Sequence, residues 1–489
     1  MSGHNQPKGL FRFFVDNSLF LITGAVIALI WANWAAQNNS HSYHDFIHFD
    51  VRTLVGAGES HVDGHGEVGG EEHSLPVVAE SEAAAGVDES VGADEHTAPV
   101  EVAEDSHANH DETVSDDSTS GESDSHDSPA DTGHHWYSLL FIINDVLMAL
   151  FFAIAAKEVW ESLLPGGALS NPRKAATPLL ATFGGIAGPA LFFLGGAMLT
   201  GTTAEFGKGW AVPCATDIAF SYLVARLIFG VGHPAIAFLL LLAIADDAAG
   251  LVILAIFYPS APIEPIWLLL TAAAMFVAWL LSKMKVQSHW FYILGPGIAS
   301  WFSFYEANLH PALGLVPIIP LLPSASSDLG IFAREELNRQ DTLNEFEHFW
   351  KVPVEIILGL FGLVNAGVVL SSVGTGTWLV LVGLLVGKPV GITFMTFLSE
   401  KVLRLEKPAG MDYRHVVTLG MVAGIGFTVA LFVSVAAFKV PGAIQDSVKM
   451  GALLSFAAAP LSIVIAKALG VRVGDHLGST NDVPSEGTT

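Results

Sequence analysis

Two adjacent aspartates, Asp246 and Asp247, stand in the middle of the apolar stretch FLLLLAIADDAAGLVILAIFY, residues 238–258. The composition of this stretch is typical of a membrane-spanning helix. One carboxylate at the centre of a bilayer costs roughly 2.5–3.5 kcal/mol even on a lenient insertion scale. Neighbouring residues of a helix point about 100° apart, so one aspartate can face an aqueous cavity while the other reaches a neighbouring helix. We predict that the pair has a function.

Three further ionisable residues fall inside apolar stretches: Asp145 in FIINDVLMALFF, Asp217 in AVPCATDIAFSYL and Lys388 in LLVGKPVGITFM. Lys388 is the only basic residue deep in a predicted span, which makes it the expected partner of one paired aspartate. Hard cations prefer oxygen ligands, and buried carboxylates beside a lysine can exchange protons. These residues predict a site at Asp246 and Asp247 that accepts either a proton or Na⁺. Asp145 lies near the start of its segment, where a structural pair or polar anchor also explains it.

Two apolar segments contain helix-breaking residues. Pro213 interrupts VPCATDIA just before Thr216 and Asp217, and Gly424 and Gly426 weaken the helix in GMVAGIGFTVALF. Interrupted segments in the two halves of a transporter are typical of a midplane site between inverted repeats. The GIGF segment alone also suits close helix packing through small residues. Helix N-termini attract negative charge and C-termini attract positive charge, and the intramembrane aspartate and lysine supply both.

The composition of the chain excludes an ordinary soluble enzyme. Hydrophobic residues make up 51% of the sequence and charged residues 14%, with a mean hydropathy of +0.51, whereas a soluble domain is about 25% charged. We predict an all-α polytopic membrane protein of about twelve transmembrane helices with inverted repeats, in which two interrupted helices cross at mid-membrane. The single cysteine, Cys214, excludes an internal disulfide and a cysteine-based zinc site. The predicted segments cover 17–35, 136–156, 175–199, 210–229, 234–258, 263–281, 290–302, 309–322, 352–370, 377–398, 416–438 and 447–469.

Nearly all of the net charge of −26 belongs to residues 59–135, which hold 22 acidic residues, 9 histidines and no lysine or arginine. Low hydrophobicity with high charge predicts a disordered segment, although the histidines also permit weak divalent-metal binding. Basic residues gather in loops that a cytoplasmic N-terminus would place inside, such as KVLRLEK at 401–407. The predicted order is a cytoplasmic segment 1–16, a first helix 17–36, an external segment 37–58, the external insert 59–135, an eleven-helix transport domain 136–470 and a cytoplasmic tail 471–489.

Several of these segments resemble the NhaA-type sodium/proton antiporters. PCATDIAF, LAIADDAAG, GKPVGI and GIGFTVALF are similar to the signature segments of that family, and NDVLMALFF and VNAGV match further segments in the expected order. The resemblance implies that Asp247 is the principal carboxylate for Na⁺ and protons, with Asp246 beside it as the partner of Lys388. It also implies that Asp217, helped by Thr216, compensates the charge of the crossed half-helices.

The resemblance implies an activity as well: electrogenic, pH-regulated export of Na⁺ or Li⁺ in exchange for protons, by a secondary transporter without a cofactor. Such proteins are dimeric, lie in the bilayer of the bacterial inner membrane and bind no nucleic acid. Their pH-sensing cluster resembles Glu158 in AAKEVWESL and Glu347, His348 and Lys351 in EFEHFWK. Here the match is looser, since Lys351 replaces an expected histidine. Solvated charges on an inside loop are the alternative interpretation of the cluster.

Two other functions compete with antiport. A divalent-metal transporter would use the histidine-rich insert, but the apolar spans offer few histidines, mainly His310. An intramembrane aspartyl protease would use paired aspartates, but the GxGD pattern of those enzymes is missing, because Phe427 follows Gly426.

Overall fold

The computed structural model describes residues 19–52, 138–167, 169–324, 341–405, 407–408 and 410–471. These residues fold almost entirely into helices; within them β-structure is limited to an isolated antiparallel bridge between Asp50 and Ser138. The predictions for the N-terminal segment 1–16, the acidic insert and the tail from 472 lie outside the described residues.

The α-helices are α2 (Leu19–Gln37), α3 (Ser42–Ile47), α4 (Leu139–Phe141), α5 (Met148–Leu163), α6 (Pro172–Leu199), α7 (Thr203–Phe206), α8 (Ile218–Phe229), α9 (Pro234–Phe257), α10 (Leu268–Lys283), α11 (His289–Tyr292), α12 (Ile298–Glu306), α13 (Thr342–Asn365), α14 (Thr375–Val382), α15 (Lys388–Lys401), α16 (Tyr413–Ala423), α17 (Phe427–Ala437), α18 (Ala443–Leu454) and α19 (Ala458–Ala468). The 3₁₀-helices are η3 (Gly207–Gly209), η4 (Val212–Cys214), η5 (Pro265–Trp267), η7 (Pro311–Leu313), η8 (Ile319–Leu321), η10 (Leu370–Ser372) and η12 (Ser455–Ala457).

Three π-helical turns join α-helices into longer ones: η2 (Ile142–Leu147), η6 (Ile293–Gly297) and η11 (Gly383–Gly387). Two of them lie at prolines, because Pro296 is inside η6 and Pro389 follows η11 by two residues. Proline has no N–H to donate to the preceding turn, so the helix widens there instead of breaking. The turn η11 ends directly before Lys388.

Eight helices of the described part are long and apolar enough to cross a membrane, and the bent pair α16 and α17 makes a ninth. The chain is therefore an all-α polytopic membrane protein, as predicted, while the number twelve stays a prediction. The eight helices are Leu19–Gln37, Leu139–Leu163, Ala175–Leu199, Val212–Phe229, Pro234–Phe257, Pro265–Lys283, Thr375–Lys401 and Ala443–Ala468.

The predicted segment 309–322 does not form an α-helix. It consists of the short 3₁₀-helices η7 and η8 joined by turns. Its sequence, LHPALGLVPIIPLL, carries prolines at 311, 317 and 320, and each proline removes a backbone donor that a regular helix needs. The neighbouring predicted segments 290–302 and 352–370 fall largely on α11–α12 and on α13, respectively.

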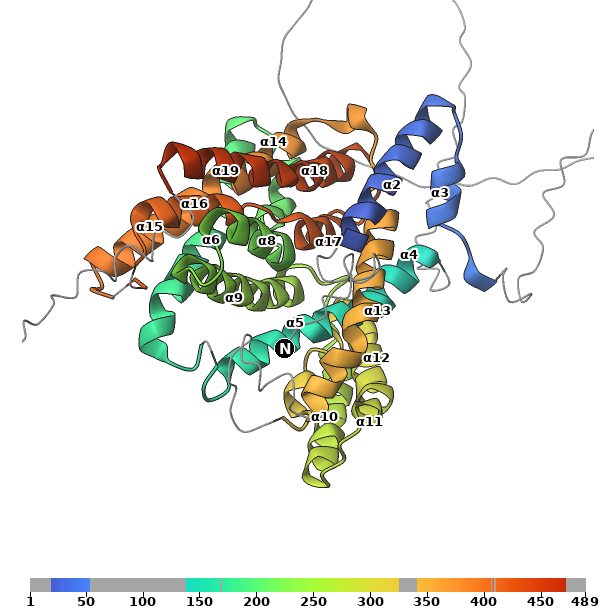
Figure 1. Cartoon of the computed structure of the whole chain (residues 1–489). Coiled ribbons are helices and arrows are strands. Elements are labelled where there is room, and N and C mark those ends of the chain that lie inside the picture. The colour runs from blue at the N-terminus through green and yellow to red at the C-terminus, as the bar shows by residue number, and fades with distance from the viewer. Residues whose placement is uncertain are drawn as a thin grey trace, which may run out of the picture. The chain divides into compact units, whose positions relative to one another are not determined.

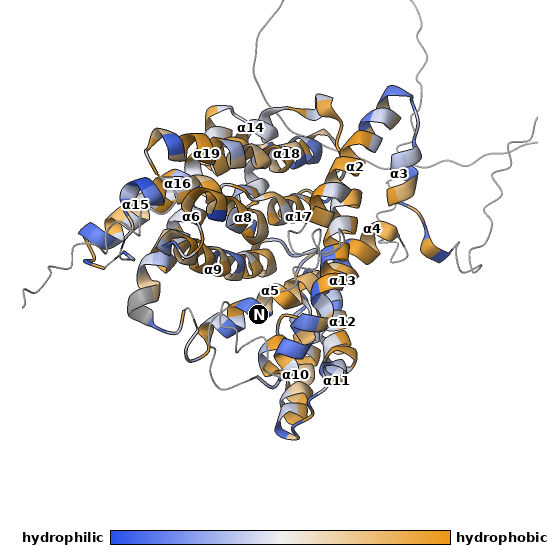
Figure 2. Ribbon diagram, viewed as in Figure 1, coloured by the Kyte–Doolittle hydropathy of each residue, from blue (hydrophilic) through white to orange (hydrophobic). Residues whose placement is uncertain are grey.

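The described helices expose apolar side chains, as a membrane-embedded protein does. Leu199 is 91% exposed, Met198 71% and Leu191 69%. Figure 2 shows hydrophobic residues along most of the helices. Many large apolar side chains exposed side by side are rare on a water-soluble monomer, so these helices fit contact with lipid.

Close packing of α6 against α15 fixes the helix that carries Lys388. Gly184 and Gly188 of α6 meet Gly387 and Gly391 across the contact, with backbone lying against backbone. Each pair has the small-xxx-small spacing that lets transmembrane helices approach closely. Figure 1 shows α6, α8, α9 and α15–α19 grouped together, with α10–α12 beside α13. The buried lysine and the aspartate pair therefore belong to one group of helices.

Candidate ion-binding site

The span that carries Asp217 is interrupted in its middle. The 3₁₀-helix η4 contains Pro213 and ends at Cys214, and Ala215 and Asp217 then have extended backbones. The helix α8 begins at Ile218 because the Asp217 side chain accepts a hydrogen bond from the Phe220 amide at 3.3 Å, which caps the helix. An aspartate at this position also faces the positive end of the helix dipole.

The span formed by α16 and α17 is interrupted as well, with a bend of 50° between the two helices. Its break covers residues 424–426, the GIG segment that the sequence singled out. A Cβ on Gly426 would lie 2.5 Å from the Ala215 carbonyl oxygen, and one on Gly424 would lie 2.7 Å from the Leu384 carbonyl oxygen. Both glycines are therefore needed for the close approach of neighbouring backbones.

The two breaks lie against each other. The Asp217 amide donates to the Ile425 carbonyl at 2.7 Å. The Thr216 hydroxyl lies 3.2 Å from the Ala423 carbonyl oxygen, and the Ser221 hydroxyl lies 3.1 Å from that of Val422. Polar groups of one interrupted span thus bond carbonyls in the last turn of α16, where a helix leaves carbonyls without a full set of partners.

The Asp217 carboxylate also accepts a hydrogen bond from the hydroxyl of Thr428, which lies in the first turn of α17. Its carboxylate therefore lies at the N-terminal ends of both α8 and α17, where the helix dipoles favour a negative charge. Its predicted role as the charge that compensates the crossed half-helices stays a prediction.

Lys388 meets Asp246 in the interior. The Lys388 Nζ lies 2.8 Å from Asp246 Oδ2, and both side chains are almost completely buried, at 0% and 1% exposure. The ammonium group also donates to the Cys214 carbonyl, at the C-terminal end of η4. The Thr216 hydroxyl lies 2.8 Å from the same Asp246 oxygen. One carboxylate oxygen therefore joins α9, α15 and the first interrupted span.

Asp247 is bonded very differently from its neighbour. It is half-buried, and its Oδ1 atom has no hydrogen-bond partner among the described residues. The Oδ1 atom of Asp246 is likewise buried without a described partner. Glu158 on α5 lies within electrostatic reach of Asp247. The aspartate pair thus presents two unpartnered acceptor atoms beside a buried ion pair, and such atoms can accept a proton or ligate a cation.

Asp145 takes part in a different contact. It lies in the π-turn η2, where its Oδ1 atom is 3.6 Å from His310 Nδ1 and its carbonyl accepts from Trp301 at 2.8 Å. Asn144 next to it exchanges two hydrogen bonds with Asn365 of α13. These contacts fit the polar-anchor interpretation that the sequence left open for Asp145.

Two of the residues predicted to regulate the pH response, Glu158 and Glu347, lie close to Lys157, which was not among the predicted residues. Lys157 is 4% exposed and pairs with Glu161 at 2.5 Å and with Glu347 of α13. Glu158 lies within electrostatic reach of this group, whereas His348 and Lys351 are exposed. The spacing of Lys157 and Glu161, four residues apart on one helix, was the available signal.

Among the residues that the structure describes, no three His, Cys, Asp or Glu side chains are grouped to hold a metal ion. The histidine-rich insert, on which the divalent-metal alternative rests, lies outside that part of the chain. The described spans therefore give this alternative no additional support.

Comparison with known proteins identifies the family. Residues 125–466 match the family model described as Na⁺/H⁺ antiporter 1. The chain is 44% identical over 479 residues to the Na(+)/H(+) antiporter NhaA of Jannaschia sp. (strain CCS1), which covers 94% of this chain and 97% of that relative. The protein of the same name from Geotalea uraniireducens (strain Rf4) is 51% identical over 344 residues, which cover 70% of this chain and 88% of that relative. The one from Desulfitobacterium hafniense (strain Y51) is 50% identical over 338 residues, which cover 68% of this chain and 86% of that relative. The chain therefore belongs to the Na⁺/H⁺ antiporter family and is a secondary transporter, not an enzyme.

Proposed function

We propose that this Na⁺/H⁺ antiporter binds its two substrates in competition at Asp247, and that Asp246 and Lys388 form the second, coupled group. The unequal bonding of the two aspartates carries the proposal. Asp246 accepts from Lys388 and Thr216 through its Oδ2 atom, whereas no side-chain hydrogen bond reaches Asp247 from the described residues. Burying an unsatisfied polar atom is costly, and either a proton or a Na⁺ ion relieves that cost.

The exchange follows from this competition. A Na⁺ ion displaces the proton on Asp247, and a proton later displaces the ion. Exposure of the site to one side of the membrane at a time then couples the two fluxes. When Lys388 leaves Asp246 it also releases a proton, so more positive charge enters as protons than leaves as Na⁺. The exchange is then electrogenic.

Asp217 and Thr216 support the site in this proposal. Asp217 faces the N-terminal ends of two half-helices, and Thr216 connects the two breaks to Asp246. Movement of one interrupted span would therefore alter the bonding of Asp246 directly. This is the physical link between access to the site and its protonation.

We also propose that Glu158, Glu347, His348 and Lys351, together with Lys157, set the pH response. These residues lie in the C-terminal half of α5 and the N-terminal half of α13. The protein transports Li⁺ as well as Na⁺ and works as a homodimer in the bacterial inner membrane. Both termini are cytoplasmic, which the basic residues of the loops support.

Substituting Asp247→Asn tests the proposal. The amide keeps the volume of the carboxylate but can bear neither its charge nor an exchangeable acid proton. We expect Na⁺- and Li⁺-dependent dissipation of a pH gradient in inverted vesicles to be abolished. The matched control, Asp145→Asn, changes the same group in the His310 contact and should leave exchange measurable.

Retained Na⁺-dependent dissipation in the Asp247→Asn variant would exclude the proposed site. The same vesicles should be challenged with K⁺ and with Zn²⁺ or Mn²⁺. A pH response to a divalent ion that survives the Asp247→Asn change would favour the metal-transporter alternative.

A further inference from the structure

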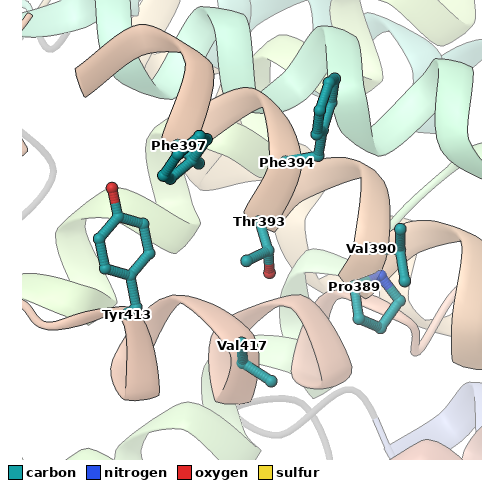
Figure 3. Close-up of a pocket in the computed structure, with 7 residues that line it drawn as sticks. All are labelled: Pro389, Val390, Thr393, Phe394, Phe397, Tyr413 and Val417. Carbon is teal, nitrogen blue, oxygen red and sulfur yellow. The ribbon is translucent and has the colours of Figure 1, made fainter. Parts of the chain in front are cut away.

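An apolar groove lies between α15 and α16, with a volume of about 420 Å³. Its walls include Val390, Phe394 and Phe397 of α15 and Val417 of α16, and Figure 3 shows these side chains around the space between the two helices. The exposed fractions of Val390, Phe394 and Phe397 are 49%, 59% and 48%. The groove therefore opens on a face where α15, a membrane-spanning helix, contacts the bilayer.

One polar atom in the groove has no partner. The Thr393 side chain points from α15 toward α16 (Figure 3), and its Oγ1 atom is buried without a hydrogen bond in the described structure. Thr396, on the same helix, instead donates to the Ile392 carbonyl four residues before it. Because the Thr393 Oγ1 atom is buried, it adds no accessible polar group to the groove.

The groove ends at a basic segment. Tyr413 lines that end, and Lys407 Nζ lies 4.5 Å from the centre of the Tyr413 ring. Residues 400–414 hold four basic and three acidic residues. The Arg414 side chain is 50% exposed, and its guanidinium is 3.0 Å from Asp412. Basic pockets between transmembrane helices recognise lipid headgroups.

We propose that the groove binds an anionic phospholipid, with one acyl chain between α15 and α16 and the headgroup at Lys407 and Arg414. The nearly uniform apolar lining suits an acyl chain, whereas a peptide would bring backbone polar groups that need partners at membrane depth. The Tyr413 hydroxyl is already bonded to Glu400. Lys407 and Arg414 contact Glu400 and Asp412, at 3.2 Å and 3.0 Å, so the headgroup would bind beside these ion pairs. Residues 400–414 still hold one more basic than acidic residue, which favours an anionic over a zwitterionic headgroup.

The lipid would act on the helix that carries Lys388. Pro389, which lines the groove, follows Lys388 directly, and a Cβ on Gly420 of α16 would lie 2.8 Å from Pro389 Cα. An acyl chain beside this contact supports α15 against one half of an interrupted span. We expect exchange to be faster in bilayers that contain anionic lipid.

Binding is measured on the purified full chain, delipidated and reconstituted with phosphatidylglycerol or phosphatidylcholine that carries a photoactivatable acyl chain. Phosphatidylglycerol should cross-link within residues 389–417 and phosphatidylcholine much less. The changes Lys407→Gln and Arg414→Gln should each weaken the phosphatidylglycerol preference about fivefold and together about thirtyfold.

Val417→Trp fills the groove and should reduce cross-linking about tenfold. Its matched control is Val277→Trp on α10, where Val277 is 45% exposed away from the groove. Equal cross-linking of the two lipids by the wild-type chain, or none within 389–417, would refute the proposal. Because the readout is bound lipid, it is independent of whether Asp247 carries the exchange.

Discussion

Lys388 carries a buried charge that only a few contacts stabilise. Its side chain is completely buried, and its ammonium group meets the Asp246 carboxylate and the Cys214 carbonyl. A buried ion pair adds little net stability when compared with apolar residues, but removing one partner leaves an isolated charge that costs far more. The pair is therefore sensitive to single changes and tolerant of matched ones.

This asymmetry gives a prediction. Lys388→Gln should destabilise the protein by about 3–5 kcal/mol, because Asp246 is left charged and unpaired. The double variant Lys388→Gln/Asp246→Asn should recover most of that loss, since two neutral amides can bond each other. Thermal unfolding in detergent measures both effects. If the double variant is as unstable as the single one, the pair is not the source of the loss.

Buried charged residues in the membrane spans were predictable from the sequence, because a charge in an apolar segment costs several kcal/mol. That cost singled out Asp217, Asp246, Asp247 and Lys388, which the structure places around the two breaks and the buried ion pair. Lys157 gave no such signal. It stands near the end of a span, where a lysine normally extends its charged group toward water, and its pairing with Glu347 depends on how α13 packs.

At the scale of elements, the crossing of the two interrupted spans depends on backbone contact. Pro213 and the GIG segment predicted the breaks, because proline and glycine weaken a helix by known mechanisms. The contact of Asp217 with Ile425 was not predictable, since it joins residues far apart in the sequence. For the stretch 309–322 the prediction of a membrane-spanning helix was wrong. The stretch is hydrophobic enough for such a helix, but it holds too many prolines for an α-helix.

Gly426→Ala tests the crossing. The added Cβ would lie 2.5 Å from the Ala215 carbonyl oxygen, a backbone atom that cannot move aside alone. We expect a loss of about 1–3 kcal/mol in stability, by analogy with overpacked cores, and slower Na⁺-dependent exchange. Gly250→Ala on α9 is the matched control, because nothing lies within 4 Å of its added Cβ. Equal exchange rates in the two variants would contradict the role of the crossing.

At the scale of the whole molecule, the acidic insert is separate from the transport helices in sequence and charge. The residues that flank it meet: the Leu139 amide donates to the Phe49 carbonyl at 3.1 Å, beside the bridge between Asp50 and Ser138. The fold therefore already holds Phe49 and Asp50 beside Ser138 and Leu139, the described residues on either side of the insert. A shorter connection between them costs less closure entropy than the present one.

We predict that deletion of residues 59–131 leaves exchange intact. Charges of the insert act on cations over about 10 Å at moderate salt, so any effect should be confined to low ionic strength. Vesicles that contain the deletion variant, with membrane insertion checked by immunoblot, should dissipate a pH gradient on addition of Na⁺ within about twofold of the full chain at 0.1 M salt, the regime in which screening is strong. Adding Asp247→Asn to the deletion variant must abolish the signal. Loss of exchange in an inserted deletion variant would instead assign the insert a part in transport.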